Sequence, residues 1–238
     1  MVPRKIHVCW PTKDLLDIQA PMVQAGVRRL RDLNPDWHLT VYDDSDVMRE
    51  LSSYMGSEKY EALFTDSGFV EKSDLWRLYK MYYEGGLYVD VDRLCDVRLS
   101  DILDEGVMCI LPTCGDLDFS QDVMLSSPGN PIHARAISLI EHRRAEGSRN
   151  VYFLGPQTYM HAVTIELMGE MMDTNPGLEK FETIRAKIAT IPFMRTYREE
   201  PPGHTLLYRG RDVTYGEWES MKRSFYAKSG LKHWSGEW

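Results

Sequence analysis

Two aspartates, Asp90 and Asp92, stand at the end of a short apolar run and have the types and spacing best suited to chemistry. The run, LYVDV at residues 87–91, has the composition of a buried strand. Because side chains two residues apart on a strand point to the same face, the two carboxylates would project together and repel each other. A divalent cation between them relieves that repulsion, and oxygen ligands suit Mn²⁺ or Mg²⁺. The alternative is a solvated turn in which Asp90 caps a backbone group.

The segment before this strand carries a second set of polar residues. Residues 68–84 place apolar side chains at helical spacing, and Gly85 and Gly86 are expected to end the helix. Asp74 and Arg77 are three residues apart, and Ser73 and Arg77 are four apart, so the three side chains lie along one face. This pattern indicates either a surface ion pair or a ligand-facing cluster, in which Asp74 accepts from ribose hydroxyls and Arg77 contacts a phosphate or fixes an aspartate.

The elements that must position these residues alternate between strands and helices. Strands are expected at residues 6–10, 37–42, 87–91, 107–111 and 122–126, and helices at 18–33, 68–84, 132–145 and 157–172. This order predicts an α/β fold with a mostly parallel central sheet flanked by helices. In such folds ligands bind at the carboxyl ends of the strands, where the two aspartates fall. We interpret residues 1–238 as a single domain whose segment from about residue 174 is irregular.

Composition excludes several classes of function. A net charge of −8 argues against a nucleic-acid surface, and it means that an anionic ligand needs a cation or well-placed arginines. No segment approaches the roughly 20 apolar residues of a membrane span, and the N-terminus lacks the apolar stretch of a signal peptide. We therefore expect a soluble, cytoplasmic protein. The 4 cysteines form no CxxC pair, which favours buried reduced thiols over disulfides or zinc.

The run KSDLWRLYKMYYEGGLYVDVD, residues 72–92, resembles the DXD-containing sugar-binding region of glycosyltransferase family 32 and of the related large clostridial glucosylating toxins. The shared pattern is Ser-Asp, an Arg three residues later, a tyrosine-rich helix, Gly-Gly, an aromatic residue and Asp-x-Asp. Other pieces similar to the family are PRKIHVCW (3–10), NPDWHLTVYDD (34–44), SSPGNP (126–131), GPQTY (155–159) and HWSGEW (233–238). The resemblance implies a GT-A type fold, but residues 174–230 match none of these landmarks.

Carried over residue by residue, the resemblance implies a metal site. Asp92 would be a direct metal ligand, and Asp90 would bind the ribose and the metal. His233 would be the third protein ligand or a diphosphate contact, with an exposed tail histidine as the alternative. The implied metal ion is Mn²⁺ or Mg²⁺.

The resemblance also implies a donor site. Asp74 and Arg77 would contact the donor sugar, its ribose or its phosphate, and would form the catalytic set together with Asp90 and Asp92. Trp10 would stack on the base. The other expected substrate-binding residues are Ser73, Tyr88, Gln121, His233 and Trp234. Gln121 departs from the asparagine that the family often has there, so the acceptor side is the least defined.

The function that the resemblance implies is metal-dependent transfer of a hexose from a nucleotide-diphosphate sugar to a hydroxyl acceptor, with retention of anomeric configuration. A UDP-sugar is the first expected donor and a GDP-sugar the second, and the acceptor is a glycan or another hydroxyl compound. One alternative is a module that binds a sugar nucleotide without turnover. Another is a phosphohydrolase with Asp90 as nucleophile, although such enzymes favour Gly-Thr soon after Asp-x-Asp and Arg93-Leu94-Cys95 follows here.

Overall fold

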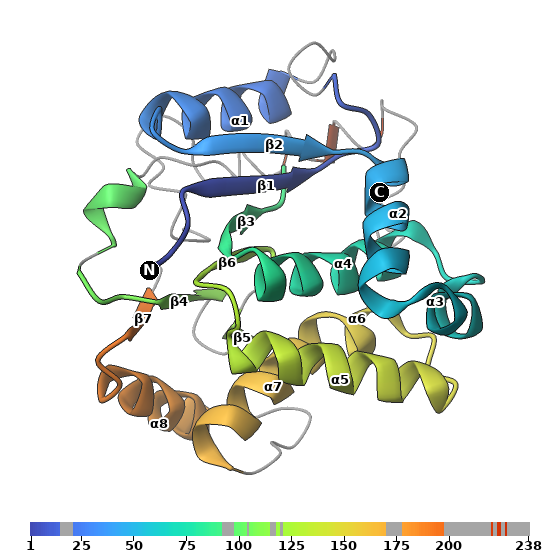
Figure 1. Ribbon diagram of the computed structural model, residues 1–238. Coiled ribbons are helices and arrows are strands. Elements are labelled where there is room, and N and C mark those ends of the chain that lie inside the picture. Colours follow the sequence, from blue (N-terminus) through green and yellow to red (C-terminus); the bar gives the residue numbers. More distant parts are fainter. Residues whose placement is uncertain are drawn as a thin grey trace.

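The computed structural model describes residues 1–14, 21–91, 98–103, 105–114, 118–119, 121–169 and 178–197, with positions 220, 223, 224 and 227 (Figure 1). Its strands are β1 (Lys5–Cys9), β2 (His38–Tyr42), β3 (Gly86–Val89), β4 (Cys109–Cys114), β5 (Asp118–Phe119), β6 (Val123–Ser126) and β7 (Met194–Tyr197). They form a 7-stranded sheet in the order β2-β1-β3-β6-β4-β5, with β7 also paired to β4.

The sheet is mixed, but most of its strands point the same way. β1 pairs in parallel with β2 and β3, and β4 pairs in parallel with β7. β6 lies between β3 and β4 and is antiparallel to both, and β5 is antiparallel to β4. The expected mostly parallel α/β sheet is therefore confirmed, with an antiparallel strand inserted beside β3. Because β1, β2 and β3 are parallel, their carboxyl ends meet at one edge, where Trp10, Asp43 and Asp90 follow.

Helices cover both faces of this sheet (Figure 1). They are α1 (Pro21–Leu33), α2 (Asp44–Met55), α3 (Ser57–Phe64), α4 (Phe69–Tyr83), α5 (Pro131–Ala145), α6 (Val151–Leu154), α7 (Pro156–Met168) and α8 (Leu178–Ala189), with a 3-10 turn η1 at Leu99–Asp101. Capping side chains begin α2 and α5. The Asp43 side chain accepts from the Asp46 amide, and Asn130 accepts from the Ile132 amide beside Pro131 in the first turn of α5.

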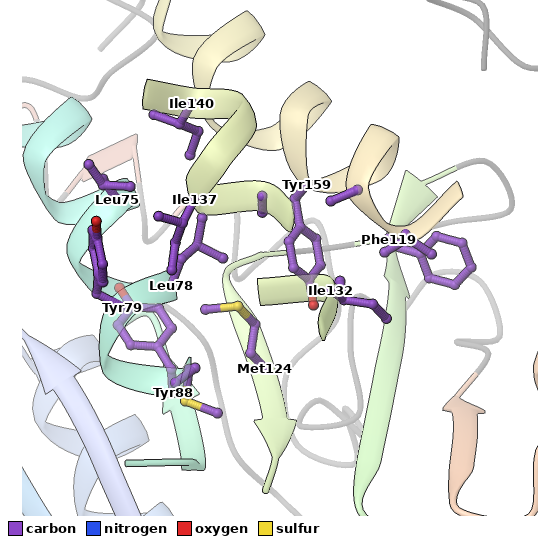
Figure 2. Close-up of a cluster of buried hydrophobic side chains, with 14 of the residues drawn as sticks. Leu75, Leu78, Tyr79, Tyr88, Phe119, Met124, Ile132, Ile137, Ile140 and Tyr159 are labelled. Atoms are coloured by element: carbon purple, nitrogen blue, oxygen red, sulfur yellow. The ribbon is translucent and has the colours of Figure 1, made fainter. Parts of the chain in front are cut away.

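Alternation along the strands divides the core into two layers. Leu87 and Val89 of β3 pack with Val27 and Leu30 of α1 on one face, whereas Tyr88 joins the larger cluster on the other face. Figure 2 shows that cluster between α4, α5, α7 and the strands, with the labelled side chains Leu75, Leu78, Tyr79, Tyr88, Phe119, Met124, Ile132, Ile137, Ile140 and Tyr159. The larger layer fixes α4 against β3 and β6, so the residues on α4 are held rigidly.

The glycine pair between α4 and β3 is required by the backbone and by lack of space. Gly85 has φ +63 and Gly86 has φ +98, in the region where a side chain is strained. A Cβ on Gly86 would lie 2.5 Å from the Lys5 carbonyl oxygen, and one on Gly85 would lie 2.7 Å from the Ser126 carbonyl oxygen. This turn therefore brings α4 directly into β3, as the sequence predicts.

Several expectations need correction. β3 ends at Val89, so Asp90 and Val91 lie beyond the strand expected at 87–91. The segment expected to be irregular from about residue 174 contains α8 and β7, because β7 finds a partner in β4 far back along the chain. Cys9 and Cys109 are free thiols, and Cys109 is buried as expected whereas Cys9 is only partly buried. In the part of the chain that the structure describes, no helix has the length and hydrophobicity needed to cross a membrane.

Candidate functional site

Asp74 and Arg77 form a buried ion pair on α4. Arg77 Nη2 lies 2.7 Å from Asp74 Oδ1, and the two side chains are only 8% and 9% exposed. The two side chains are therefore not the surface ion pair that the sequence also allows. Their charges are screened by water less than those of an exposed pair would be. Ser73 is also buried, but its hydroxyl donates to the Val70 carbonyl in the same helix at 2.9 Å, so it is not brought to the pair.

Asp90 reaches the same guanidinium from the end of β3. Its amide donates to the Asp122 carbonyl at 2.9 Å, which continues the pairing with β6 by one residue. Arg77 Nη1 lies 3.3 Å from Asp90 Oδ1, and the Tyr88 hydroxyl donates to the same oxygen at 2.5 Å. The guanidinium carbon stands 4.7 Å from the centre of the Tyr88 ring. One arginine therefore joins a helix carboxylate to a strand-end carboxylate.

Gln121, which precedes β6, bonds to both members of the buried ion pair and completes a cluster with Asp74, Arg77 and Asp90. Its carbonyl accepts from Arg77 Nη1 at 3.3 Å, and its side-chain amide hydrogen-bonds to Asp74. Gln121 Oε1 and Arg77 Nε are buried polar atoms that have no hydrogen-bond partner within the described structure. Buried polar atoms are normally satisfied, so these two atoms have unused hydrogen-bonding capacity beside Asp74.

Burial and charge act on the titration of these groups in opposite directions. Burial raises the pKa of Asp74 to about 6, although the Arg77 charge and the hydrogen bond from Gln121 oppose that rise. Burial alone would lower the pKa of Arg77, but the Asp90 and Asp74 charges raise it above its ordinary value. Burial also raises the pKa of the Tyr88 hydroxyl well above its usual range, so Tyr88 acts as a hydrogen-bond donor to Asp90. The cluster retains two carboxylates around one cation.

The other predicted site residues are placed only in part. Trp10 follows β1 at the same edge of the sheet and donates its amide to the Tyr42 carbonyl at 3.0 Å, but its side chain is packed in the α1-side core. Asp92, His233 and Trp234 lie outside the described residues, and so does Trp238. The described residues alone contain no group of three His, Cys, Asp or Glu side chains that fits a metal ion. Base stacking and the metal ligand set therefore stay predictions.

Residues 21–108 match the family described as "Glycosyltransferase sugar-binding region containing DXD motif", a range that includes α4, the glycine turn and Asp90. This part of the chain is therefore similar to DXD-type glycosyltransferase sugar-binding regions. This finding confirms the resemblance seen in the sequence, and it agrees with a buried cluster in which Arg77 joins Asp74 to Asp90.

Curated relatives of the chain include mannosyl phosphorylinositol ceramide synthase SUR1 of Saccharomyces cerevisiae, 26% identical over 146 residues. Inositol phosphoceramide mannosyltransferase 1 of Schizosaccharomyces pombe is 27% identical over 149 residues. Each match covers 60% of this chain, but only 35% and 44% of the respective relative. The solved PaToxG glycosyltransferase is similar over 94% of this chain and 84% of its own, with a TM-score of 0.51 and 17% identity. That likeness confirms the predicted GT-A type fold.

One residue beside the cluster of Asp74, Arg77 and Asp90 cannot be found from the sequence pattern. Gly155 precedes α7, and a Cβ there would lie 2.3 Å from Asp74 Oδ2. The GPQTY segment shows a glycine and a proline where a helix begins, which is an ordinary boundary signal. The residues around Gly155 do not indicate that this helix boundary contacts α4, because Gly155 and Asp74 are 81 positions apart in the chain.

Proposed function

We propose that this protein transfers a hexose from a nucleotide-diphosphate sugar to a hydroxyl acceptor, with a divalent metal ion and with retention of anomeric configuration. The observation that supports this most is the buried cluster in which Arg77 joins Asp74 to Asp90 within the DXD region. Two carboxylates held by a guanidinium at the carboxyl edge of the sheet can accept hydrogen bonds from sugar hydroxyls and can hold the cation that an anionic diphosphate needs.

The described residues have distinct proposed roles toward the donor. A sugar hydroxyl both donates and accepts, so it can satisfy buried Gln121 Oε1 and Arg77 Nε, which have no other partner in the described structure. Asp74, held by Arg77 and Gln121, would accept from a second hydroxyl. Because these groups are already fixed by the fold, they orient the donor without reorganising during transfer.

The proposed metal ligands are Asp90, Asp92 and His233, and the ion is Mn²⁺ or Mg²⁺. Asp90 fits this role, because its side chain is 31% exposed at the sheet edge while Arg77 and Tyr88 fix its direction. Carboxylate oxygens and an imidazole nitrogen are ligands that these ions accept. When bound, such an ion neutralises charge on the departing diphosphate.

The proposed transfer step requires no nucleophile from the protein. The bond between the anomeric carbon and the diphosphate oxygen breaks as the acceptor oxygen bonds to the same face of that carbon. The acceptor hydroxyl proton passes to the departing phosphate oxygen. Arg77 would fix the direction of Asp90 and would offset part of the charge on the leaving group by its own charge, and the buried surroundings would exclude water that hydrolyses the donor.

Two relatives are named as mannosyl-transferring enzymes acting on inositol phosphoceramide, which makes mannose the first sugar to test. A UDP-sugar remains the first proposed donor class and a GDP-sugar the second. The chain spans less than half of those relatives, so their lipid acceptor is only one hydroxyl acceptor to include.

The proposal is tested by thermal unfolding with UDP-, GDP- and dTDP-hexoses, each with and without Mn²⁺, followed by assay of donor hydrolysis. A donor at about 100 times its Kd adds about 2.7 kcal/mol, which is a shift of roughly 5–10 °C for a chain of this size. Asp92→Ala should abolish the shift and the Mn²⁺-dependent hydrolysis, whereas Asp101→Ala, at the exposed 3-10 turn, should retain both.

Full activity of Asp92→Ala would contradict the metal assignment. A donor-dependent shift without hydrolysis or transfer would favour the binding module instead. Phosphate release from generic phosphomonoesters, with no shift from any sugar nucleotide, would favour the phosphohydrolase.

A further inference from the structure

Gly155 occupies a position with no room for a side chain. It lies between α6 and α7, and a Cβ there would stand 2.3 Å from Asp74 Oδ2 and 2.6 Å from Gln121 Nε2. Its φ of −90° is outside the left-handed region, so a positive φ is not the reason for glycine here. The reason is close approach: the corner between α6 and α7 presses directly on the two side chains proposed to face the donor sugar.

One buried arginine ties the two sides of this corner together. Arg143, in the last turn of α5, donates from Nη1 to the Phe153 carbonyl at 3.0 Å and to the Thr158 hydroxyl. The Thr158 hydroxyl in turn donates to the Phe153 carbonyl at 2.8 Å. The guanidinium carbon also lies 4.0 Å from the centre of the Phe153 ring. Phe153 precedes Gly155 by two residues and Thr158 follows it by three, so the arginine spans the corner.

The remaining partner of Arg143 is His161 on α7. Arg143 Nη2 contacts His161 Nδ1. A guanidinium only donates, so Nδ1 must accept and the ring must be neutral. Burial, and then the Arg143 charge, lower the pKa of His161, which keeps the ring neutral at physiological pH. No carboxylate pairs with Arg143 in the described part of the chain, and its hydrogen bonds all go to neutral groups of the α6–α7 segment.

We propose that Arg143 is a positioning residue for the donor sugar, because it fixes the α6–α7 corner and thereby holds Gly155 against Asp74 and Gln121. This inference rests on the proposed function, since it assumes that Asp74 and Gln121 face a sugar. It assigns Arg143 to the sugar end of the donor and not to the nucleotide end, which we expect beside Trp10 after β1. Loss of Arg143 would therefore weaken binding of the nucleotide sugar more than binding of the nucleoside diphosphate.

The test measures Kd by calorimetry, in Mn²⁺, for UDP-glucose against UDP or for GDP-mannose against GDP, whichever pair the full chain binds. Arg143→Met should weaken binding of the nucleotide sugar about tenfold and change binding of the nucleoside diphosphate less than twofold. Arg135→Met is the matched control, because Arg135 also joins α5 to α7, through Glu166 at 2.7 Å, but on the surface. It should change neither value.

A second variant covers the case in which Arg143→Met fails to fold. Thr158→Val keeps the buried volume, removes one acceptor of Arg143, and should show the same selective loss at smaller size. The inference is wrong if either folded variant loses the same affinity for the nucleotide sugar as for the nucleoside diphosphate. It is also wrong if neither variant loses affinity for the nucleotide sugar. If the unmodified chain binds no nucleotide sugar while binding UDP or GDP, the proposed function itself fails, which is a different result.

Discussion

At the scale of single residues, Arg77 bonds to groups from three separate parts of the chain. It contacts Asp74 on its own helix, Asp90 after β3 and the carbonyl of Gln121 before β6. Only a guanidinium has enough donors in a fixed plane to bond to all three, so lysine would not replace it. Removing it would leave Asp74 without its buried counter-charge, a change that typically costs about 3–5 kcal/mol. The same residue thus stabilises the fold and fixes the proposed donor contacts.

His7 allows a residue-scale prediction about acid stability. It is buried in β1, where Nε2 donates to the Gly85 carbonyl at 3.0 Å and Nδ1 accepts from the Tyr42 hydroxyl at 3.3 Å. Burial lowers the pKa of His7 from 6.5 to about 4. Between these values the unfolded chain binds more protons, so stability is fully present above pH 6.5 and falls as the pH falls toward 4. At pH 5 the loss from this one residue is about 2 kcal/mol.

His7→Gln keeps an amide donor for the Gly85 carbonyl but does not titrate. Urea unfolding at pH 7.5 and pH 5 should therefore show a stability loss about 2 kcal/mol smaller in this variant than in the unmodified chain. His142→Gln, at an exposed position of α5, is the control for loss of a surface histidine, and its stability at pH 7.5 should stay close to that of the unmodified chain. An unaltered acid loss in His7→Gln would show that His7 is not buried neutral.

At the scale of elements, the glycine turn between α4 and β3 determines how the DXD region is assembled. Gly86→Ala would combine positive-φ strain with a Cβ 2.5 Å from the Lys5 carbonyl oxygen, in a backbone that pairs with β1. We expect a loss of about 3 kcal/mol or more in the free energy of unfolding, measured by urea denaturation. Gly147→Ala, at φ +92 with nothing within 4 Å, should lose only about 1 kcal/mol from backbone strain. Equal losses would contradict the packing of β3 against β1.

The same elements show what the sequence can predict and what it cannot. Helical periodicity, the apolar run and the Gly-Gly pair predict α4, β3 and their order, because those signals are local. The sequence does not determine whether Asp74 and Arg77 are buried, since the spacing of two charged residues is the same on a surface helix as on a covered one. β7 was missed and Gly155 was not given a role, because each depends on a partner far away in the chain. Asp92 and His233 remain predictions of the sequence alone.

At the scale of the whole molecule, charge decides what an anionic donor needs in order to bind. The chain has a net charge of −8, and the cluster of Asp74, Arg77 and Asp90 sets one arginine against two carboxylates. A nucleotide-diphosphate sugar carries negative charge of its own, so without a cation it meets repulsion from the molecule and from the site. Salt at 0.1 M screens charges beyond about 10 Å, which reduces the long-range repulsion but leaves the local one.

Removal of divalent metal with EDTA should therefore weaken binding of UDP-glucose or GDP-mannose by about 100-fold or more, measured by calorimetry. Raising NaCl in the presence of EDTA should recover only a small part of this loss, because the diphosphate would still face Asp90 at close range. Uridine or guanosine is the matched control ligand: it lacks phosphate, so its weaker binding should not depend on EDTA. If the nucleotide sugar binds equally well with EDTA, arginine side chains of the chain must neutralise the diphosphate, and the assignment of Asp90 and Asp92 as metal ligands is wrong.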